Sequence, residues 1–200
     1  MSLKLIGLTA TLAAFIISVA PDIAGAESDK PLKTATNARV SVSTKGEAEQ
    51  RFTAYITGYG YWDNTPPGSV AISKPVIHSG AGGTGTFKDP VTIAVGHTIN
   101  GSRQTLDYAP GTRFYIERLR KYAIVEDVCG DGNNPQGGPC HTGYQGHPWL
   151  DVYIGGGSKT ASATTACARQ ITALQKIIIN PKPDYPVHAG EITGTGCQVF

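Results

Sequence analysis

The sequence lacks the charge imbalance that is typical of nucleic-acid-binding proteins. Its 17 lysines and arginines against 15 acidic residues give a formal net charge of +2, so we expect no nucleic-acid partner. Two catalytic signatures are also missing: the five histidines form neither an i, i+4 pair nor an H-E-x-x-H motif, and no G-x-S-x-G elbow is present. We therefore expect neither a metal centre nor a cofactor.

No apolar run reaches the roughly 20 residues that a membrane-spanning helix needs. The run from Leu5 to Val19 follows Lys4, is closed by Pro21 and precedes the small-residue triplet Ala24-Gly25-Ala26. This is the layout of a secretory signal peptide over residues 1–26, whereas the alternative, a membrane anchor, needs a longer run. We expect cleavage after Ala26 and a secreted or periplasmic protein without stable membrane insertion.

Large apolar residues are scarce between residues 27 and 50, where Ser, Thr, Lys, Ala and Glu dominate. Such a segment cannot bury enough apolar surface to fold and predicts a flexible linker. Residues 51–200 then form one folded unit of ordinary domain size, which we expect to be monomeric. No repeat is visible at the periods of solenoids or propellers.

All four cysteines lie in the expected folded unit, and an even count in an exported protein predicts two disulfides. The sequence alone permits three pairings; we favour Cys129–Cys140, which closes a Gly/Pro-rich loop, and Cys167–Cys197, which ties down the C-terminal tail. The alternative is a zinc site of Cys129, Cys140 and His141. Its ligand spacing is not that of a usual zinc finger, and export favours oxidation.

Glycine and proline punctuate the folded unit, and runs of β-branched and aromatic residues of strand length lie between them. This pattern predicts a mainly β fold with long Gly/Pro-rich loops. The expected strands are 52–57, 91–95, 112–117, 122–127 and 150–154.

Two turns and one C-terminal helix complete the expected elements. Asn100-Gly101 predicts a hairpin, because both positions tolerate positive φ, and Pro110-Gly111 predicts a turn. Apolar residues recur at helical steps from Ser162 to Ile178, and Pro181 then stops the pattern. We interpret the apolar stripe of this helix as core packing.

Residues 80–85, Gly-Ala-Gly-Gly-Thr-Gly, match the G-x-G-x-x-G fingerprint of dinucleotide-binding loops. That fingerprint requires a strand before it and a helix after it, whereas Pro90 and the β-branched Val91-Thr92-Ile93 follow here. We interpret the segment as a loop whose backbone passes close to a neighbouring strand or a ligand.

Two aspartates near the ends of expected strands are candidate catalytic residues. Asp127 lies in the segment Ile124–Cys129, and Asp151 lies in Pro148–Tyr153. A strand that delivers a carboxyl beside a Gly-rich loop suits acid catalysis on sugars, because desolvation raises the pKa of the carboxyl until it holds a proton. The alternative for each is a turn cap or an acceptor for backbone amides.

Asp63 is a third candidate, because it directly follows Tyr59-Gly60-Tyr61-Trp62. Aromatic rings beside a carboxylate suit a groove that stacks the flat faces of sugars, whereas an ordinary Asp-Asn turn before Pro66-Pro67 is the alternative. The residues expected to contact a substrate are Tyr55, Tyr59, Tyr61, Trp62 and Trp149.

Five segments in order, Thr53–Tyr55, Ile93–Val95, Gly111–Glu117, Val125–Asp127 and Leu150–Tyr153, resemble the double-psi β-barrel superfamily. The resemblance spans about residues 52–156. Within the superfamily, the chain most resembles the three-aspartate domain of bacterial lytic transglycosylases. It is more distantly similar to rare lipoprotein A, expansins, barwin and family 45 endoglucanases. The resemblance implies a six-stranded barrel with a shallow saccharide groove.

The resemblance also implies residue roles. Asp127 and Asp151 match the second and third aspartates of the transglycosylase domain, whereas Gly96 stands where the first is expected. Tyr61-Trp62-Asp63 is similar to an early segment of family 45 endoglucanases whose aspartate serves as base, and Asp151 is similar to their acid.

Together these features predict a cell-wall polysaccharide-acting protein. It would cleave peptidoglycan as a lytic transglycosylase does, or β-glucan as an endoglucanase does, with an aspartate as acid. One alternative is an expansin-like protein that binds or loosens wall glycans without cleaving them. Another is a secreted interaction or defence module similar to barwin, which needs no functional groove.

Overall fold

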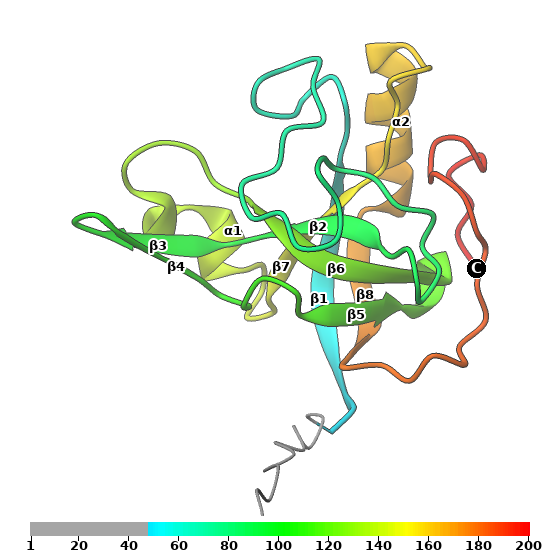
Figure 1. The fold of residues 1–200 in the computed structure, drawn as a ribbon, viewed down its shortest axis with the longest axis horizontal. Coiled ribbons are helices and arrows are strands. Elements are labelled where there is room, and N and C mark those ends of the chain that lie inside the picture. The colour runs from blue at the N-terminus through cyan, green and yellow to red at the C-terminus, as the bar shows by residue number, and fades with distance from the viewer. Residues whose placement is uncertain (1–47) are drawn as a thin grey trace, which may run out of the picture. The chain divides into compact units, whose positions relative to one another are not determined.

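The computed structural model describes residues 48–200 (Figure 1). The expected signal peptide, residues 1–26, lies outside the described residues, and so does nearly all of the expected linker, residues 27–50. Gln50 is already the first residue of a strand. Within the described part of the chain, no helix combines the length and hydropathy that crossing a membrane requires.

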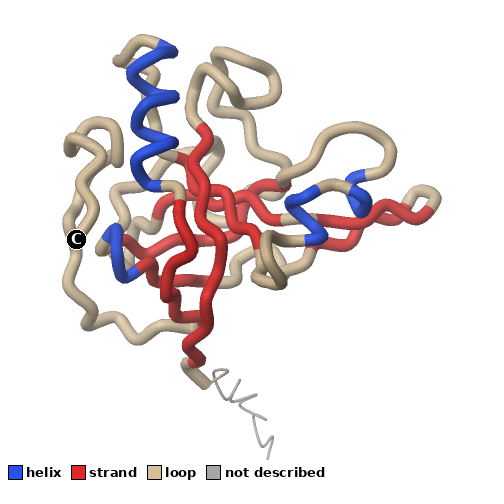
Figure 2. The backbone as a smooth tube through the Cα atoms, turned by 180° about the vertical axis from the view of Figure 1, so that it is seen from behind, coloured by secondary structure: helices blue, strands red, loops and turns tan. Residues whose placement is uncertain are grey.

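Six strands close into a barrel in the order β1-β7-β2-β6-β5-β8 (Figures 1 and 2). They are β1 (Gln50–Tyr59), β2 (Val91–Val95), β5 (Arg113–Ile116), β6 (Lys121–Val128), β7 (Trp149–Tyr153) and β8 (Ala173–Ile179). A separate two-stranded sheet consists of β3 (His97–Asn100) and β4 (Arg103–Leu106), and the helical elements are α1 (Pro139–Thr142), α2 (Ala161–Ile171) and two 3₁₀ turns, Glu117–Leu119 and Pro135–Gly137.

The predicted mainly β class is confirmed, and the barrel has the predicted six strands. Each of the five expected strands exists, with ends shifted by two residues at most. The Asn100-Gly101 hairpin also forms: Asn100 pairs with Arg103 across the turn, and Gly101 takes a φ of +61°. For these five strands and this hairpin, the sequence pattern and the turn residues therefore agree with the fold.

The predicted helix over Ser162–Ile178 is wrong in its second half. α2 ends at Ile171, and the chain continues as β8, which pairs with both β1 and β5. The run Ile177-Ile178-Ile179 is β-branched and favours a strand. Closing the barrel with this strand also removes two open sheet edges, a tertiary gain that overrides the helical spacing of the apolar residues.

Alternation along the strands separates a packed interior from an outer face that carries polar residues. In β7, Leu150 and Val152 are fully buried in the core, whereas Trp149 and Asp151 are partly exposed on the other face. The main core is filled mostly by aliphatic side chains from every barrel strand. The interior is thus a packed core, and any functional surface lies on the outer face or in the loops.

The glycine-rich loop passes close to its neighbours, as expected. A Cβ on Gly83, whose φ is +97°, lies 2.0 Å from the carbonyl oxygen of Pro90, and one on Gly85 lies 2.2 Å from a side-chain carbon of Lys121. Only glycine fits such approaches at positive φ.

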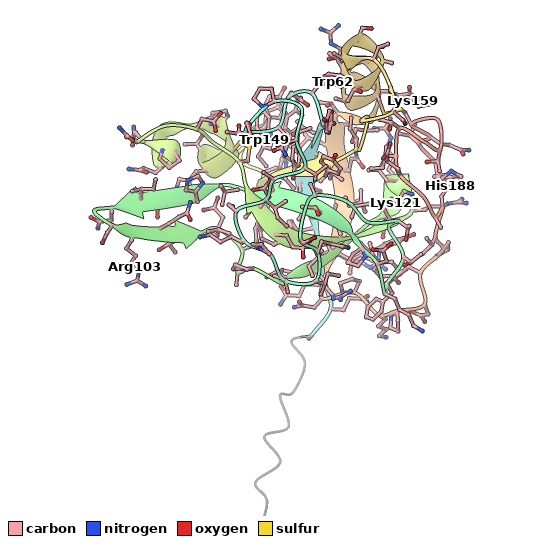
Figure 3. The ribbon with its side chains drawn as sticks, turned by 45° about the horizontal axis from the view of Figure 1, so that its top comes forward. Trp62, Arg103, Lys121, Trp149, Lys159 and His188 are labelled. Carbon is pink, nitrogen blue, oxygen red and sulfur yellow. A yellow bond between two sulfur atoms is a disulfide. The ribbon has the colours of Figure 1, made fainter. Side chains whose placement is uncertain are left out.

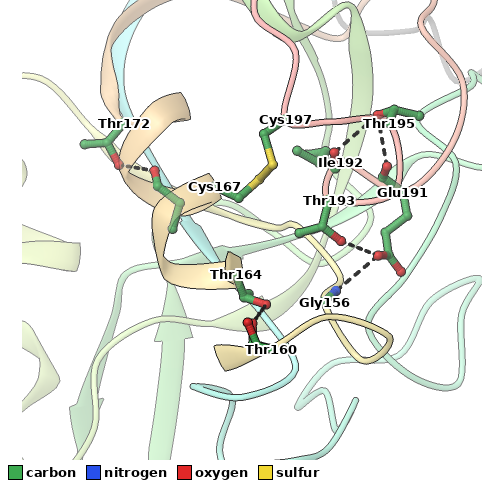
Figure 4. The surroundings of a disulfide bond; sticks show 11 residues. Gly156, Thr160, Thr164, Cys167, Thr172, Glu191, Ile192, Thr193, Thr195 and Cys197 are labelled. Carbon is green, nitrogen blue, oxygen red and sulfur yellow. Dashed lines mark hydrogen bonds between the residues drawn. A yellow bond between two sulfur atoms is a disulfide. The ribbon is translucent and has the colours of Figure 1, made fainter. Parts of the chain in front are cut away.

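Both favoured disulfides are present, Cys129–Cys140 and Cys167–Cys197. The zinc alternative is therefore wrong, because both of its cysteines are bonded to each other. Cys129–Cys140 closes the loop between β6 and α1. Cys167–Cys197 joins α2 to the C-terminal segment, where Glu191 accepts hydrogen bonds from Gly156 and Thr193 (Figure 4).

Removal of the Cys167–Cys197 bond is expected to destabilise the fold more than removal of Cys129–Cys140. The bonds span 30 and 11 residues, and a longer closed loop restricts the unfolded chain more. We expect the Cys167→Ala/Cys197→Ala variant to lose about 3–4 kcal/mol in urea unfolding. A larger loss in Cys129→Ala/Cys140→Ala would contradict the prediction.

Candidate functional site

A row of four residues crosses the outer face of the barrel where β1, β7, β2 and β6 lie side by side. Thr57 of β1 pairs with Asp151 of β7. Asp151 in turn pairs with Ala94 of β2, which pairs with Asp127 of β6. The ladder thus brings the two predicted aspartates to either side of one alanine methyl group.

A β-bulge in β6 directs Asp127 outward. Ile93 pairs with Val125 and Ala94 pairs with Asp127, so Glu126 is an extra residue without a partner on β2. A bulge opposes two residues to one and re-aims the side chains that follow it. Val125 packs in the core, whereas the carboxyl groups of Glu126 and Asp127 both contact the loop that covers the outer face.

Glu126 anchors that loop. Its side chain is fully buried, and its Oε1 accepts the backbone N–H groups of residues 76–78 at 3.1, 2.7 and 2.9 Å. Its Oε2 lies 2.6 Å from Nδ1 of His78, whose Nε2 lies 2.9 Å from Oδ1 of Asp89. Burial opposes the charge of Glu126, but the hydrogen bonds from His78 and Ile77 lower its pKa below the usual value.

Asp151 has the environment of a carboxyl that holds a proton near neutral pH. Burial raises its pKa to about 7, and the charges of Asp63 and Asp127 act in the same direction. Its Oδ1 accepts a hydrogen bond of 2.6 Å from the Thr57 hydroxyl, which itself accepts one of 2.8 Å from Nε1 of Trp149. The carboxyl is therefore held by one neutral donor, the Thr57 hydroxyl, which Trp149 in turn fixes.

Asp127 is held as a hydrogen-bond acceptor. Its Oδ1 accepts the backbone N–H groups of Ser73 and Val128 at 3.1 and 2.9 Å, and its Oδ2 accepts the Tyr59 hydroxyl at 3.0 Å. Burial and the charge of Asp127 raise the pKa of Tyr59 well above its usual value, so Tyr59 stays protonated and donates. The alternative that Asp127 accepts backbone amides is thus correct, and the carboxyl also lines a groove.

The groove has a volume of about 360 Å³, within the range of small-molecule sites. Its lining includes Tyr59, Asp63, Asn64, Ser73, Ala94, Asp127, Asp131 and Asp151. Asn64 shapes one wall, because its side-chain amide donates to the backbone oxygens of Ser69 and Ala71 at 3.1 and 3.0 Å. The three predicted aspartates therefore share one hollow.

Asp63 is tied to its own turn although it lines the groove. Its Oδ1 accepts the backbone N–H of Gly60 at 2.7 Å, which is the turn-forming interaction that we considered as the alternative. The residue is exposed, and its charge contributes to the raised pKa of Asp151.

The predicted aromatic residues fall into two groups. Tyr59 and Trp149 reach the aspartates directly or through Thr57, and Tyr55 packs edge to face against Trp149 with 4.7 Å between ring centroids. Tyr61 and Trp62 form the second group and contact each other edge to face. The indole N–H of Trp62 donates to the backbone oxygens of Gly156 and Lys159, which places the ring beside the start of α2 (Figure 3).

No carboxyl fits at position 96. A Cβ on Gly96 lies 2.3 Å from the carbonyl oxygen of Cys140 and 2.4 Å from Oδ2 of Asp107. The carboxyl group of Asp107, which follows β4, thus occupies the space beside the end of β2.

Sequence reasoning assigned no role to Thr57, Glu126 or Asp107. Thr57 lies two residues from both Tyr55 and Tyr59 in the same strand. Because alternate residues of a strand point to the same face, the sequence indicated that Thr57 shares a face with them. Glu126 and Asp107 had no such signal, because their positions depend on the bulge and on the β3–β4 hairpin. Among residues 48–200, no group of three or more His, Cys, Asp or Glu side chains is arranged to hold a metal ion.

Comparison with known proteins gives one family match. The family model described as the DDB_G0273701 N-terminal domain matches residues 51–198, a range that contains both central aspartates. An uncharacterized protein of Dictyostelium discoideum, DDB_G0273701/DDB_G0273221, is 33% identical over 144 residues, which is 70% of this chain and 56% of that protein. The chain thus spans little more than half of this relative's length. No solved structure matches the chain.

The His78 interactions are expected to make stability depend on pH. Burial lowers the pKa of His78, but the hydrogen bonds to Asp89 and Glu126 outweigh it and raise the value above that of the unfolded chain. The stabilisation is therefore complete below about pH 6.5 and is lost as pH rises through the folded-state pKa. Urea unfolding of wild type and His78→Asn measures it: the difference in unfolding free energy shrinks from acidic to alkaline pH, and a constant difference would contradict this account.

Substitution of Gly96 by alanine is expected to destabilise the protein by about 1–3 kcal/mol, because the added methyl group overlaps backbone and a paired carboxyl. Gly82→Ala is the matched control, since the nearest atom to its added Cβ is 3.9 Å away. Chemical denaturation of both variants measures the effect. Equal stability of the two would contradict the close contact at Gly96.

Proposed function

We propose that this chain, which belongs to the DDB_G0273701 N-terminal domain family, binds polysaccharide in the groove and cleaves it with Asp151 as the acid. One observation carries the proposal: a carboxyl whose pKa is raised to about 7 lies in an open groove, across one alanine from a second carboxyl. Two carboxyl groups in unlike environments are the arrangement that glycan-cleaving enzymes use.

The chemistry begins with proton transfer. Asp151 gives its proton to the glycosidic oxygen while the bond from that oxygen to the anomeric carbon breaks, so one sugar leaves as a neutral alcohol and Asp151 becomes a carboxylate. A hydroxyl oxygen then bonds to the anomeric carbon and returns its proton to Asp151. If that hydroxyl belongs to the same sugar, the product is an anhydro-sugar; if it is water, the product has a reducing end.

Asp127 is the partner of Asp151 in this proposal. Asp127 lies on β6, two strands away from Asp151 on β7, and the backbones of the two residues are roughly 10 Å apart at the usual strand spacing. Its negative charge stabilises the positive charge that develops at the anomeric carbon. The Asp127 carboxyl is held in place by hydrogen bonds from Tyr59, Ser73 and Val128.

The strand order supports a barrel of the double-psi type. Two parallel pairs, β1–β7 and β2–β6, meet through the antiparallel pair β2–β7, and the carboxyl residues lie on that central strip. This arrangement agrees with the resemblance to lytic transglycosylases, expansins and family 45 endoglucanases, and it makes a wall glycan, peptidoglycan or β-glucan, the proposed substrate.

Export belongs to the proposal as well. Two disulfides are typical of proteins that fold outside the reducing cytosol. Together with the signal-peptide pattern of residues 1–26, they support a secreted or periplasmic protein that meets its glycan outside the cytoplasm.

A second candidate function is binding without cleavage, as in expansins. It is favoured by the state of Asp63, whose carboxyl is engaged by Gly60, and by the lack of any carboxyl on Gly96. Of the three predicted aspartates, Asp127 and Asp151 then remain for chemistry. In this second function the same groove binds a glycan, and no carboxylate activates water.

Replacement of the acid separates the two functions. We expect the mature protein to release soluble products from purified peptidoglycan or β-glucan, and Asp151→Asn to lose at least about 100-fold in rate, since an amide cannot donate the proton. Wild-type activity is expected to fall as pH rises above about 7, where Asp151 loses its proton.

Mass spectrometry of the products identifies the reaction. Anhydro-sugars indicate transglycosylase chemistry, and reducing ends indicate hydrolysis. Retained binding with no product from wild type on any substrate would overturn cleavage and leave the binding function. Unchanged activity in Asp151→Asn would exclude this residue as the acid.

A further inference from the structure

A second hollow lies beside the groove, on the side of α1. Its volume is about 370 Å³, and it is lined by residues of α1, of the loop between α1 and β7, of the start of β7 and of the segment after β4. The lining includes Asp107, Tyr108, His141, Thr142, His147 and Trp149. None of the aspartates of the first groove lines it, so it offers a separate set of polar and aromatic groups.

Asp107 and His141 form a fixed polar pair in this hollow. Nδ1 of His141 lies 2.6 Å from Oδ1 of Asp107, and both side chains are partly exposed. Asp107 is itself held from behind, because its backbone N–H donates to Gly96 and its Oδ2 packs against the same glycine. No hydrogen bond within residues 48–200 uses Nε2 of His141, which leaves this ring nitrogen for a ligand hydroxyl.

Trp149, which lines the hollow with this pair, belongs to a cluster of three aromatic rings. Tyr55 stacks on Tyr144 with 4.2 Å between centroids and meets Trp149 edge to face at 4.7 Å. Tyr144 remains 39% exposed. An exposed aromatic ring beside a few convergent polar groups is the lining that suits a sugar ring, whose C–H face is apolar and whose edge carries hydroxyls.

The hollow is built in advance of any ligand. The Cys129–Cys140 bond fixes α1, and the Tyr144–His147 pairing closes a tight turn in the loop that follows α1. Gly143 lies at a φ of +80°, and a Cβ there is 2.3 Å from the carbonyl oxygen of His147. Little conformational entropy is lost when a site of this kind binds.

Trp149 connects the second hollow to the groove. Trp149 and Asp151 lie two residues apart on the same face of β7, about 6.5 Å along the strand. Thr57 contacts both side chains through hydrogen bonds. A linear chain whose cleaved bond lies over Asp151 therefore reaches Trp149 within the next one or two of its units.

From these contacts we propose that the hollow around Asp107 and His141 is a second saccharide subsite, which binds the units adjacent to the bond cleaved at Asp151. The inference rests on the proposed function. A sugar ring packs on Trp149, which Tyr55 and Tyr144 hold in place through their ring contacts, and its hydroxyls bond to Asp107 and to Nε2 of His141. The site makes the protein select long chains over short ones.

The test measures affinity against chain length in the uncleaving Asp151→Asn background. The probes are β-1,4-linked N-acetylglucosamine oligomers and cello-oligomers, from dimer to hexamer, titrated by calorimetry. We expect affinity to rise with length. Addition of His141→Ala or Tyr144→Ala should weaken hexamer binding about tenfold, the effect of one lost stacking contact or hydrogen bond, and leave the dimer unchanged.

His188→Ala is the control, because Figure 3 places His188 by the C-terminal segment and Trp149 toward α1. Hexamer affinity that is unchanged in both His141→Ala and Tyr144→Ala overturns the subsite, while wild-type cleavage that Asp151→Asn abolishes leaves the proposed function intact. If no oligomer binds and wild type cleaves no glycan, both proposals fail. If one variant does not fold, the other alone decides, since one removes the hydrogen-bonding ring of His141 and the other removes an aromatic ring that supports Trp149 through Tyr55.

Discussion

The single extra residue at Glu126 in β6 is the constraint on which the candidate site depends. In a regular ladder, Glu126 and Asp127 point to opposite faces, and one carboxyl enters the barrel core. Because of the bulge, the carboxyl groups of Glu126 and Asp127 both lie on the outer face. Glu126 then fixes the covering loop through three backbone amides and His78, and Asp127 joins the wall of the groove.

Electrostatics follows from the same ladder. Because Ala94 is small, the charge of Asp127 reaches Asp151 across the floor of the groove, and Asp63 adds a second negative charge from the covering loop. Glu126 directly precedes Asp127 in the sequence, but its charge is compensated by backbone amide donors and by His78. The pKa of Glu126 is thus lowered and that of Asp151 is raised to about 7, so Asp151 holds a proton near neutral pH while it lines the groove.

The sequence was informative wherever a local pattern and the tertiary fold agree. Five strands, the Asn100 hairpin and both disulfides were predicted, and Asp127 and Asp151 were singled out because each lies near one end of an expected apolar strand. β8 was mistaken for helix, since its apolar spacing fits either period and only pairing with two distant strands decides. The bulge, the approach of Asp107 to Gly96 and the hydrogen bonds of Thr57 depend on register between strands, which no local pattern encodes.

The proposed reaction requires the proton that Asp151 holds in the free protein. Carbon-13 NMR of the side-chain carboxyl groups, followed over pH in wild type with Asp151→Asn for assignment, measures it directly. We expect the Asp151 resonance to titrate near pH 7. A midpoint at about 4, the value of an ordinary aspartate, would show that Asp151 is ionised at neutral pH and would remove the acid from the proposed reaction.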